Sequence, residues 1–304
     1  MTATAPARAH ASVRELLVAS RPLSWINTAF PFAAALLLSS RHAGALLVVG
    51  TFFFLIPYNL LMYGVNDVFD HESDERNPRK GGAEGALLAT SSLRSVLHWS
   101  IGLAVPFAVA VPILAEVERP GRGGWTAVAL AVVLFAVVAY SAPGLRFKER
   151  PVLDSATSST HFVGPAVVGL VAGGAEPTRT VLAVVVAFFC WGMAAQAFGA
   201  VQDVGPDREA GIASVATVLG ARRTVRAAVA LWVVAGLVVL LAGVPAACAA
   251  VLVVPYVLAA WPYRDVPDAD AARANRGWRA FLRLNYVCGF GVFWLCWWAW
   301  VSGG

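Results

Sequence analysis

Residues 66–80, NDVFDHESDERNPRK, carry a dense run of charged side chains directly after one of the most apolar segments of the chain, TFFFLIPYNLLMYGV at residues 51–65. Asp67, Asp70 and Asp74 follow the spacing i, i+3, i+7, which places their carboxylates on one face of a helix. Like charges in this arrangement repel one another, and desolvation near a bilayer adds to the cost. We therefore expect a cation to compensate them, with Asn66 as a neutral oxygen ligand.

The composition is typical of an integral membrane protein. Apolar residues make up 59% of the 304 residues and charged residues only 13%, whereas a soluble domain carries about 25% charged residues. Because lipid cannot satisfy exposed backbone groups, the apolar runs are predicted to be helices. Runs of spanning length occur at residues 22–40, 44–66, 93–115, 125–142, 155–174, 180–200, 224–243, 245–263 and 281–301. We predict an all-α, polytopic protein with about nine transmembrane helices in one bundle, in which a cytoplasmic segment (1–21) precedes a single transmembrane domain (22–304).

The distribution of charge supports this topology. With these runs as spans, 19 of the 23 Lys and Arg residues lie on the side of the N-terminus. The positive-inside rule then places the N-terminus in the cytoplasm. The run at 155–174 is the weakest of the set, because it begins with SATSSTHF. On the same side lie 15 of the 18 acidic residues, which orientation alone does not require, so a polar site is predicted on the cytoplasmic face of the inner cell membrane.

A second acidic cluster follows another spanning run, in AFGAVQDVGPDREAGIAS at residues 197–214. Asp203 and Asp207 are four residues apart and lie on the same predicted side as the first cluster. Several carboxylates around one cavity suit a hard divalent cation, above all Mg²⁺, which shares its remaining positions with phosphates. The predicted metal ligands are Asn66, Asp67, Asp70, Asp74, Asp203 and Asp207.

Basic side chains lie beside both clusters. Together with Asn66, the predicted diphosphate-binding residues are Arg79, Lys80, Arg146, Lys148 and Arg150. Carboxylates, Mg²⁺ and basic side chains together form a diphosphate clamp. A single acidic cluster at a helix end is more often a solvated loop, but two clusters with basic loops between them favour a site. Asp154, at the start of the fifth run, is expected to pair with Arg146 or Arg150.

These motifs resemble those of the UbiA superfamily of intramembrane prenyltransferases. NDVFDHESD fits the pattern N-D-x-x-D-x-x-x-D of that family, and DVGPD fits D-x-x-x-D. Tyr140 and Lys148 fall in the family's tyrosine-then-basic stretch after the fourth helix. The resemblance implies a helical bundle around a central cavity open to lipid, in which Mg²⁺, expected as two ions, holds an allylic diphosphate. It also implies catalytic roles for Asp67, Asp70, Asp203, Lys148 and Tyr140.

Longer stretches resemble the lycopene elongase branch of that superfamily: GVNDVFDHESDERNPRKGG, YSAPGLRFKERPVLDS and AFGAVQDVGPDREAGIASVATVLG. This resemblance implies an enzyme of the class that transfers alkyl groups other than methyl. Its donor would be dimethylallyl diphosphate, and its acceptor a lycopene-like carotenoid entering from the bilayer, on the way to C50 carotenoids. A nucleic-acid partner is not expected.

Alternatives remain open at this stage. The same chemistry could act on a quinone precursor, a chlorophyllide or haem, and Arg21 is a candidate to bind an acidic acceptor, although it also fits a cytoplasmic anchor of the first helix. A cation transporter is a remote alternative, because transporters place their acids at mid-membrane rather than at helix ends. His161 lies within the fifth run, yet no residue is identified as the base that ends the reaction. Hydration and deprotonation of the final cation therefore both remain possible.

Overall fold

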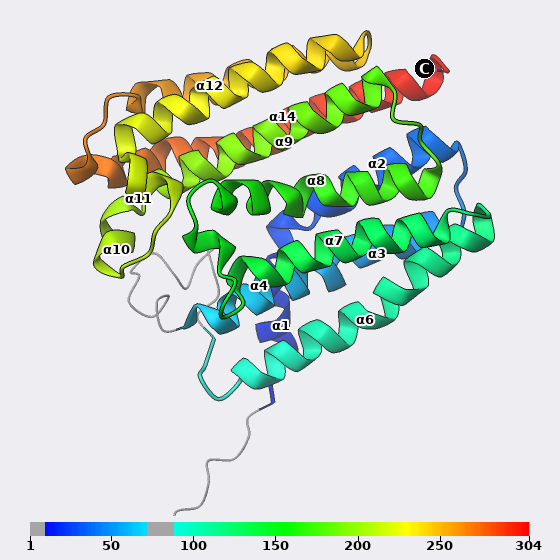
Figure 1. Cartoon of the computed structure of the whole chain (residues 1–304), viewed down its shortest axis with the longest axis horizontal. Helices are drawn as coiled ribbons and strands as arrows, with labels where there is room; N and C mark the ends of the chain where they lie inside the picture. Colours follow the sequence, from blue (N-terminus) through cyan, green and yellow to red (C-terminus); the bar gives the residue numbers. More distant parts are fainter. Residues whose placement is uncertain (1–9, 72–87, 304) are drawn as a thin grey trace, which may run out of the picture.

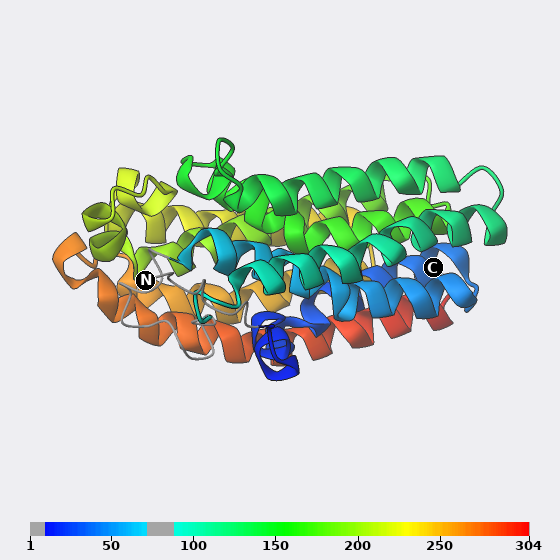
Figure 2. The same ribbon diagram turned by 90° about the horizontal axis from the view of Figure 1, so that it is seen from below.

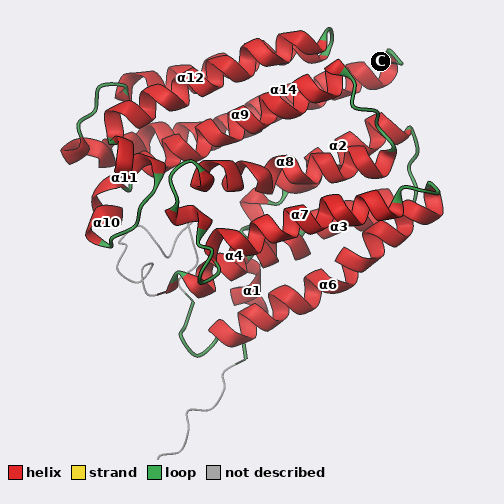
Figure 3. Ribbon diagram, in the orientation of Figure 1, coloured by secondary structure: helices red, strands yellow, loops and turns green. Residues whose placement is uncertain are grey.

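The computed structural model describes residues 10–71 and 88–303. The predicted site residues Asp74, Arg79 and Lys80 lie outside this part of the chain. Every regular element among the described residues is a helix, and the long helices run side by side in one bundle (Figure 1, Figure 3). The prediction of an all-α protein is therefore confirmed.

The α-helices are α1 (Val13–Ala19), α2 (Ile26–Ser40), α3 (Ala45–Leu55), α4 (Pro57–Phe69), α6 (Leu93–Glu118), α7 (Gly123–Ser141), α8 (Leu153–Gly173), α9 (Arg179–Val201), α10 (Val204–Glu209), α11 (Val215–Leu219), α12 (Ala221–Val239), α13 (Val254–Ala260) and α14 (Asn275–Val301). Short 3₁₀ helices are η1 (Pro22–Ser24), η2 (Phe147–Glu149), η3 (Leu240–Ala242), η4 (Ala246–Val253), η5 (Trp261–Tyr263) and η6 (Asp268–Ala274).

Among the described residues, eight helical segments are long and apolar enough to cross a membrane. They match eight of the nine predicted runs, and the remaining run, 155–174, corresponds to α8. This helix forms as predicted, but its first half is polar, and its buried residues include Asp154, Ser155, Thr157, Ser159 and His161. Because those side chains face protein rather than lipid, α8 is less apolar than the helices around it. The count of nine spans and the cytoplasmic N-terminus stay predictions.

The second predicted run is two helices, α3 and α4, which meet at Pro57. Proline has no N–H and suits the first turn of a new helix. The break leaves carbonyl groups of α3 without their usual donors, and the Asn59 amide replaces them. Its Nδ2 donates to the carbonyls of Phe54, at 2.8 Å, and Leu55, at 3.1 Å. The Thr28 hydroxyl also donates to the Phe54 carbonyl, at 2.6 Å, so the chain changes direction without exposing polar backbone to lipid.

Helix α8 packs closely against its neighbours because small residues stand at the crossings. It lies between α2, α7 and α9 (Figure 1). A Cβ atom added at Gly169 would lie 2.5 Å from the Phe32 carbonyl oxygen of α2, and one added at Gly192 of α9 would lie 2.4 Å from Ser159 Oγ of α8. Close backbone approach of this kind is common between membrane helices. It brings the polar half of α8 against α7 and α9.

Two large apolar cores hold most of the bundle together, and a smaller third core with Ala19, Leu60 and Val96 joins α1, α4 and α6. One of the large cores joins α2, α3, α4, α6, α7 and α8 around Phe32, Phe53 and Tyr58, and the other joins α9, α12, α13 and α14 around Trp232 and Phe281. In the perpendicular view the long helices run lengthwise and the short α1 is seen end-on (Figure 2). The end of α4, the α7–α8 connection, α10 and α11 all lie toward one end of the bundle (Figure 1). The predicted polar residues are thereby collected at that end.

Candidate active site

Asp67 lies on the last turns of α4 and is bonded to a residue far away in the sequence. Its side chain is 0% exposed, and Arg21 Nη2 donates to its Oδ1 at 2.8 Å. Arg21 stands between α1 and η1 with a left-handed backbone, φ 49°. Its guanidinium lies 4.1 Å from the centre of the Tyr63 ring, one turn before Asp67. The buried carboxylate is therefore compensated by a cation that is itself held against an aromatic ring.

Asp70 ends α4 and is surrounded by donors from the neighbouring chain segments. Lys148 Nζ contacts Asp70 Oδ1, and Arg146 Nη2 lies 3.9 Å from the same atom. Asn66 Nδ2 donates to Asp70 Oδ2 and, at 2.9 Å, to Ser141 Oγ at the end of α7. Four of the predicted residues thus form one cluster in which α4 is joined to the α7–α8 connection.

The α7–α8 connection presents its basic residues in different directions. Lys148 lies in η2 and points to Asp70, whereas Arg146, with φ 41°, also pairs with Glu149. Arg150 is exposed, with its guanidinium near the Gly144 carbonyl, at 3.4 Å, and over the Phe147 ring. Of the three predicted cations of this segment, two reach Asp70 and Arg150 does not.

The electrostatics of Lys148 relate it to both acidic clusters. Burial lowers the pKa of Lys148 to about 8, while the charges of Glu149, Asp207 and Asp67 oppose this shift by favouring the ammonium form. Direct contact with Asp70 acts in the same direction, so the side chain is a cation at neutral pH. Lys148 therefore lies within electrostatic range of a carboxylate from each cluster.

The second cluster begins where α9 ends. Asp203 is the N-cap residue of α10, and its carbonyl accepts from the Asp207 N–H at 2.9 Å. Both side chains are partly buried. The connection is held by Asp154 at the start of α8, whose Oδ2 accepts from the Val215 N–H at 2.8 Å and whose Oδ1 accepts from the Ser155 N–H at 2.6 Å. The bond from Val215 ties α8 to α11, which follows the loop that carries Asp203 and Asp207.

The expected pairing of Asp154 with Arg146 or Arg150 is wrong. The side chain of Asp154 is turned into the protein, where backbone N–H groups satisfy it. Arg21 also differs from a simple membrane anchor, because its guanidinium is bonded to Asp67 and lies over Tyr63. Both results depend on contacts between segments that are distant in the sequence.

Several contacts of the site were not predicted from the sequence. Ser141 and Tyr63 are ordinary members of apolar helices, and no local pattern identifies them as partners of Asn66 and Arg21. Gln196 is different, because an amide in the middle of the apolar helix α9 is unusual. Its Oε1 accepts from Ser158 Oγ at 2.9 Å, and its Nε2 donates to the Tyr140 hydroxyl at 3.3 Å. The amide of Gln196 inside an apolar spanning run was the feature of the sequence that could have identified it as a site residue.

The donor set fits Mg²⁺ in its chemistry. Asn66, Asp67, Asp70, Asp203 and Asp207 offer the hard oxygen atoms that this ion prefers. Among the described residues no three acidic, histidine or cysteine side chains are grouped closely enough to form a metal site by themselves. Lys148 and Arg21 instead supply the compensating charge for Asp70 and Asp67.

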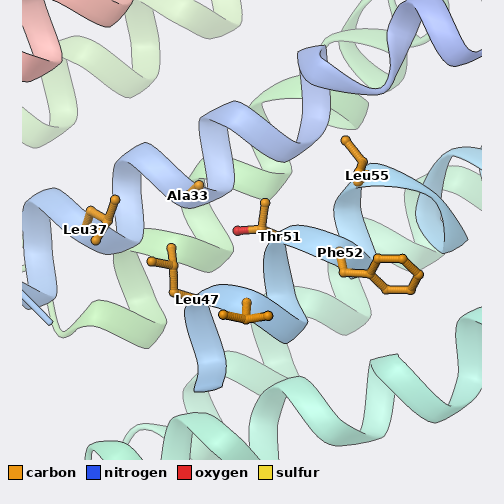
Figure 4. Close-up of a pocket in the computed structure, with 7 residues that line it drawn as sticks. Ala33, Leu37, Leu47, Thr51, Phe52 and Leu55 are labelled. Atoms are coloured by element: carbon orange, nitrogen blue, oxygen red, sulfur yellow. The ribbon is translucent and has the colours of Figure 1, made fainter. Parts of the chain in front are cut away.

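Two pockets lie away from this cluster. One, of about 440 Å³, is an apolar groove between α2 and α3 lined by Ala33, Leu37, Thr51 and Phe52 among others (Figure 4). The other, of about 610 Å³, is lined by residues of the first turns of α6 and by His10. Neither is lined by a predicted site residue. The apolar groove has no side chain that could bind a diphosphate, and its walls suit lipid chains.

Comparison with known proteins assigns the chain to a family. The model of the UbiA prenyltransferase family matches residues 28–287. The chain belongs to the UbiA prenyltransferase family. It is therefore a prenyltransferase and, with its apolar helices, a multi-pass membrane protein.

Two relatives and one solved structure show how far the likeness extends. The chain is 52% identical to the C(50) beta-cyclic carotenoids biosynthesis protein LbtBC of Dietzia sp., over 93% of this chain and 64% of that protein, so it spans just under two thirds of the length of this relative. It is 47% identical to a lycopene elongase/hydratase of Corynebacterium glutamicum, over 91% of this chain and 94% of that protein. A UbiA homologue from Archaeoglobus fulgidus, solved with DMAPP and Mg²⁺, has a TM-score of 0.65 at 18% identity and covers 90% of this chain and 98% of its own. That structure confirms the fold.

Proposed function

We propose that this enzyme transfers a prenyl group from dimethylallyl diphosphate to the ends of lycopene or a related carotenoid, in a Mg²⁺-dependent reaction at the cytoplasmic face of the cell membrane. The acceptor class is supported by the names of relatives that are about half identical to this chain over nearly all of its length. The reaction type is supported by the cluster around Asp70, where carboxylate, amide and cationic groups meet at the end of the bundle.

The donor diphosphate finds complementary charge in this cluster. Lys148 and Arg146, which both contact Asp70, would bind phosphate oxygens. Asn66, Asp67, Asp70, Asp203 and Asp207 would hold Mg²⁺, with Asp74 from outside the described residues. When bound, this ion neutralises the negative charge that develops on the departing diphosphate. Lys148 and Arg146 would stabilise the same developing charge.

The cation formed from the donor must be kept from water until the acceptor reacts. Tyr140 precedes Ser141, which is hydrogen-bonded to Asn66 of the cluster. The Tyr140 hydroxyl accepts a hydrogen bond from Gln196, and its ring packs edge-to-face against the ring of His161. Ring faces stabilise a carbocation electrostatically, and an apolar enclosure excludes water. Among the predicted catalytic residues, Tyr140 is the one proposed for this role.

The state of Arg21 favours a hydrocarbon acceptor over an acidic one. An aromatic acid acceptor requires a basic side chain to bind its carboxylate. Arg21 is the candidate for that purpose, but its guanidinium is bonded to Asp67 and covers Tyr63. A carotenoid end is apolar and needs no such partner. This contact supports the carotenoid over the quinone-precursor alternative.

The test is product analysis in a bacterial host that accumulates lycopene. Pigments would be extracted and analysed by liquid chromatography with mass detection, with the protein verified in the membrane. We expect new C45 and C50 species with the wild type, and none with the double variant Asp67→Asn/Asp70→Asn. The matched control is Asp265→Asn, because Asp265 is exposed and pairs with Arg226 away from the cluster. Unchanged lycopene with the wild type would exclude this acceptor, and full activity of the double variant would exclude the site.

A further inference from the structure

An amide cluster, formed by Gln196, Ser158 and Tyr140, joins three helices just inside the polar end of the bundle. The Ser158 hydroxyl of α8 donates to Gln196 Oε1 at 2.9 Å, and Gln196 Nε2 of α9 donates to the Tyr140 hydroxyl at 3.3 Å. Tyr140 lies in the last turn of α7 and Ser158 in the second turn of α8, whereas Gln196 lies five residues before the end of α9, about 8 Å along the helix. The prenyl transfer described so far uses the Tyr140 ring but has no use for the Gln196 amide.

The amide cluster has hydrogen-bonding capacity that the protein does not use. A glutamine amide offers two N–H donors and two acceptor positions, and Gln196 uses one of each. The Tyr140 hydroxyl accepts from Gln196, but its own O–H proton has no acceptor in the described part of the chain. A polar bridge that served only to join helices would be expected to satisfy its members, because unused polar groups inside a membrane bundle are costly. The spare groups therefore indicate a small polar ligand.

A water molecule fits the size and the chemistry of these spare groups. Tyr140, Ser158 and Gln196 are all only partly buried, so each keeps surface that a molecule of this size can touch, whereas Ser159 is buried. The spare groups include both donors and acceptors, and a water molecule inside a protein typically makes about three hydrogen bonds of both kinds. Tyr140 is followed by Ser141, which is bonded to Asn66, so this water would lie next to the diphosphate-binding residues.

The proposed reaction leaves a cation that is ended either by loss of a proton or by addition of water. When the allylic cation adds to the terminal double bond of the acceptor, a new C–C bond forms and a tertiary carbocation remains. A water molecule that donates its hydrogens to Gln196 Oε1 and Ser158 Oγ keeps an oxygen lone pair free to react with this carbocation. A single bound water also spares the earlier allylic cation, which bulk water would capture.

We propose that the amide cluster binds the water molecule that ends the reaction by hydration. The oxygen lone pair forms a C–O bond to the tertiary cationic carbon, and the resulting oxonium passes one proton to a second water molecule, so that a neutral tertiary alcohol remains. Gln196 and Ser158 orient the attacking water and keep their own covalent bonds. Hydration is also part of the name of the Corynebacterium glutamicum relative, a lycopene elongase/hydratase. This inference rests on the proposed function.

The variants separate water binding from a purely structural role of the cluster. Gln196→Leu removes the amide at nearly constant size, and Ser158→Ala is a milder change that carries the test if Gln196→Leu does not fold. Ser159→Ala is the matched control, because it is the same substitution at the next residue of α8, where the hydroxyl donates to the Phe189 carbonyl at 2.8 Å. Thermal unfolding of each purified protein identifies the variants that fold.

The experiment uses purified full-length protein with dimethylallyl diphosphate, Mg²⁺ and lycopene in ¹⁸O-labelled water, and measures the products by liquid chromatography with mass detection. We expect the elongated product of the wild type to be an alcohol that carries the label. In Gln196→Leu the ratio of alcohol to alkene should fall by about tenfold, as for the loss of one hydrogen bond to the water, while total elongated product falls less. Ser158→Ala should shift the ratio in the same direction, and Ser159→Ala should keep the wild-type ratio.

Three results would overturn the inference. The first is a wild-type ratio of alcohol to alkene in the folded variants of Gln196 and Ser158, whatever the loss of total product. The second is an equal decrease of that ratio in Ser158→Ala and Ser159→Ala, which indicates a general effect of packing around α8. The third is an elongated wild-type product without labelled oxygen. A wild type that forms no elongated product is a different outcome, because it rejects the proposed function itself.

Discussion

The ion pair between Arg21 and Asp67 is the strongest quantitative test of the site geometry. Arg21 precedes α2 and Asp67 lies near the end of α4, 46 residues later, yet Nη2 and Oδ1 are 2.8 Å apart. Because Asp67 has further interactions, its single variants report more than this pair. A double-mutant cycle of Arg21→Gln, Asp67→Asn and the two together isolates the pairwise energy.

The expected coupling follows from the distance and the burial. Two unit charges with centres about 4 Å apart interact by about 4 kcal/mol at an effective dielectric constant near 20. The Asp67 side chain is 0% exposed and that of Arg21 is 19% exposed. Solvent at Arg21 reduces the coupling to about 3 kcal/mol, a factor of about 10² in the unfolding equilibrium. Each single variant should lose a similar amount, because it leaves a buried charge uncompensated.

The assay is reversible unfolding of the purified protein in mixed micelles by titration with sodium dodecyl sulfate, followed by circular dichroism. The matched control is Arg150→Gln, since Arg150 is exposed and contacts a carbonyl and a ring. Its effect should stay within about 0.5 kcal/mol. A coupling energy below about 0.5 kcal/mol for the Arg21 cycle would refute the buried pair, and with it the argument that Arg21 is unavailable to an acidic acceptor.

Three further predictions concern the elements that position the site. Gly169→Ala should lower the unfolding free energy by about 1–3 kcal/mol, because the added Cβ would clash with the backbone of α2. The control is Gly102→Ala, where an added Cβ meets nothing within 4 Å, and it should be neutral or slightly stabilising in the same titration. Equal losses of stability in the two variants would contradict the close crossing of α8 and α2. Asp154→Ala, which removes the acceptor for a backbone N–H of α11, should reduce product formation by about tenfold, whereas unchanged turnover would show that this bond does not orient the second cluster. Asp268→Ala should cost about 1 kcal/mol through loss of the cap on the first N–H of α12. Hydrogen bonds from that N–H and from Arg208 lower the pKa of Asp268 below its usual 3.8. The contribution of Asp268 to stability is therefore complete above pH 3.8 and is lost as the pH falls through the lowered pKa. A difference in unfolding free energy between wild type and variant that persists in stronger acid would contradict this assignment.

The sequence alone indicated the class of fold and the two acidic clusters, because both are local patterns. A spanning helix is recognisable from about twenty consecutive apolar residues. The break at Pro57 was not foreseen, although the proline was visible, because its effect depends on whether a side chain such as Asn59 can satisfy the freed carbonyls. Helix α8 was the weakest predicted run for a related reason: its polar residues are acceptable only when neighbouring helices cover them.

The partners within the site were decided by the tertiary structure. Asn66 meets Ser141 across 75 residues of sequence, and Asp154 meets Val215 across 61. No periodicity encodes such pairs, because they depend on how closely two helices approach, and here small residues such as Gly169 and Gly192 set that distance. Apolar length and charge thus specified the membrane bundle and the end at which its polar side chains gather, whereas the packing of helices determined which of these side chains face one another.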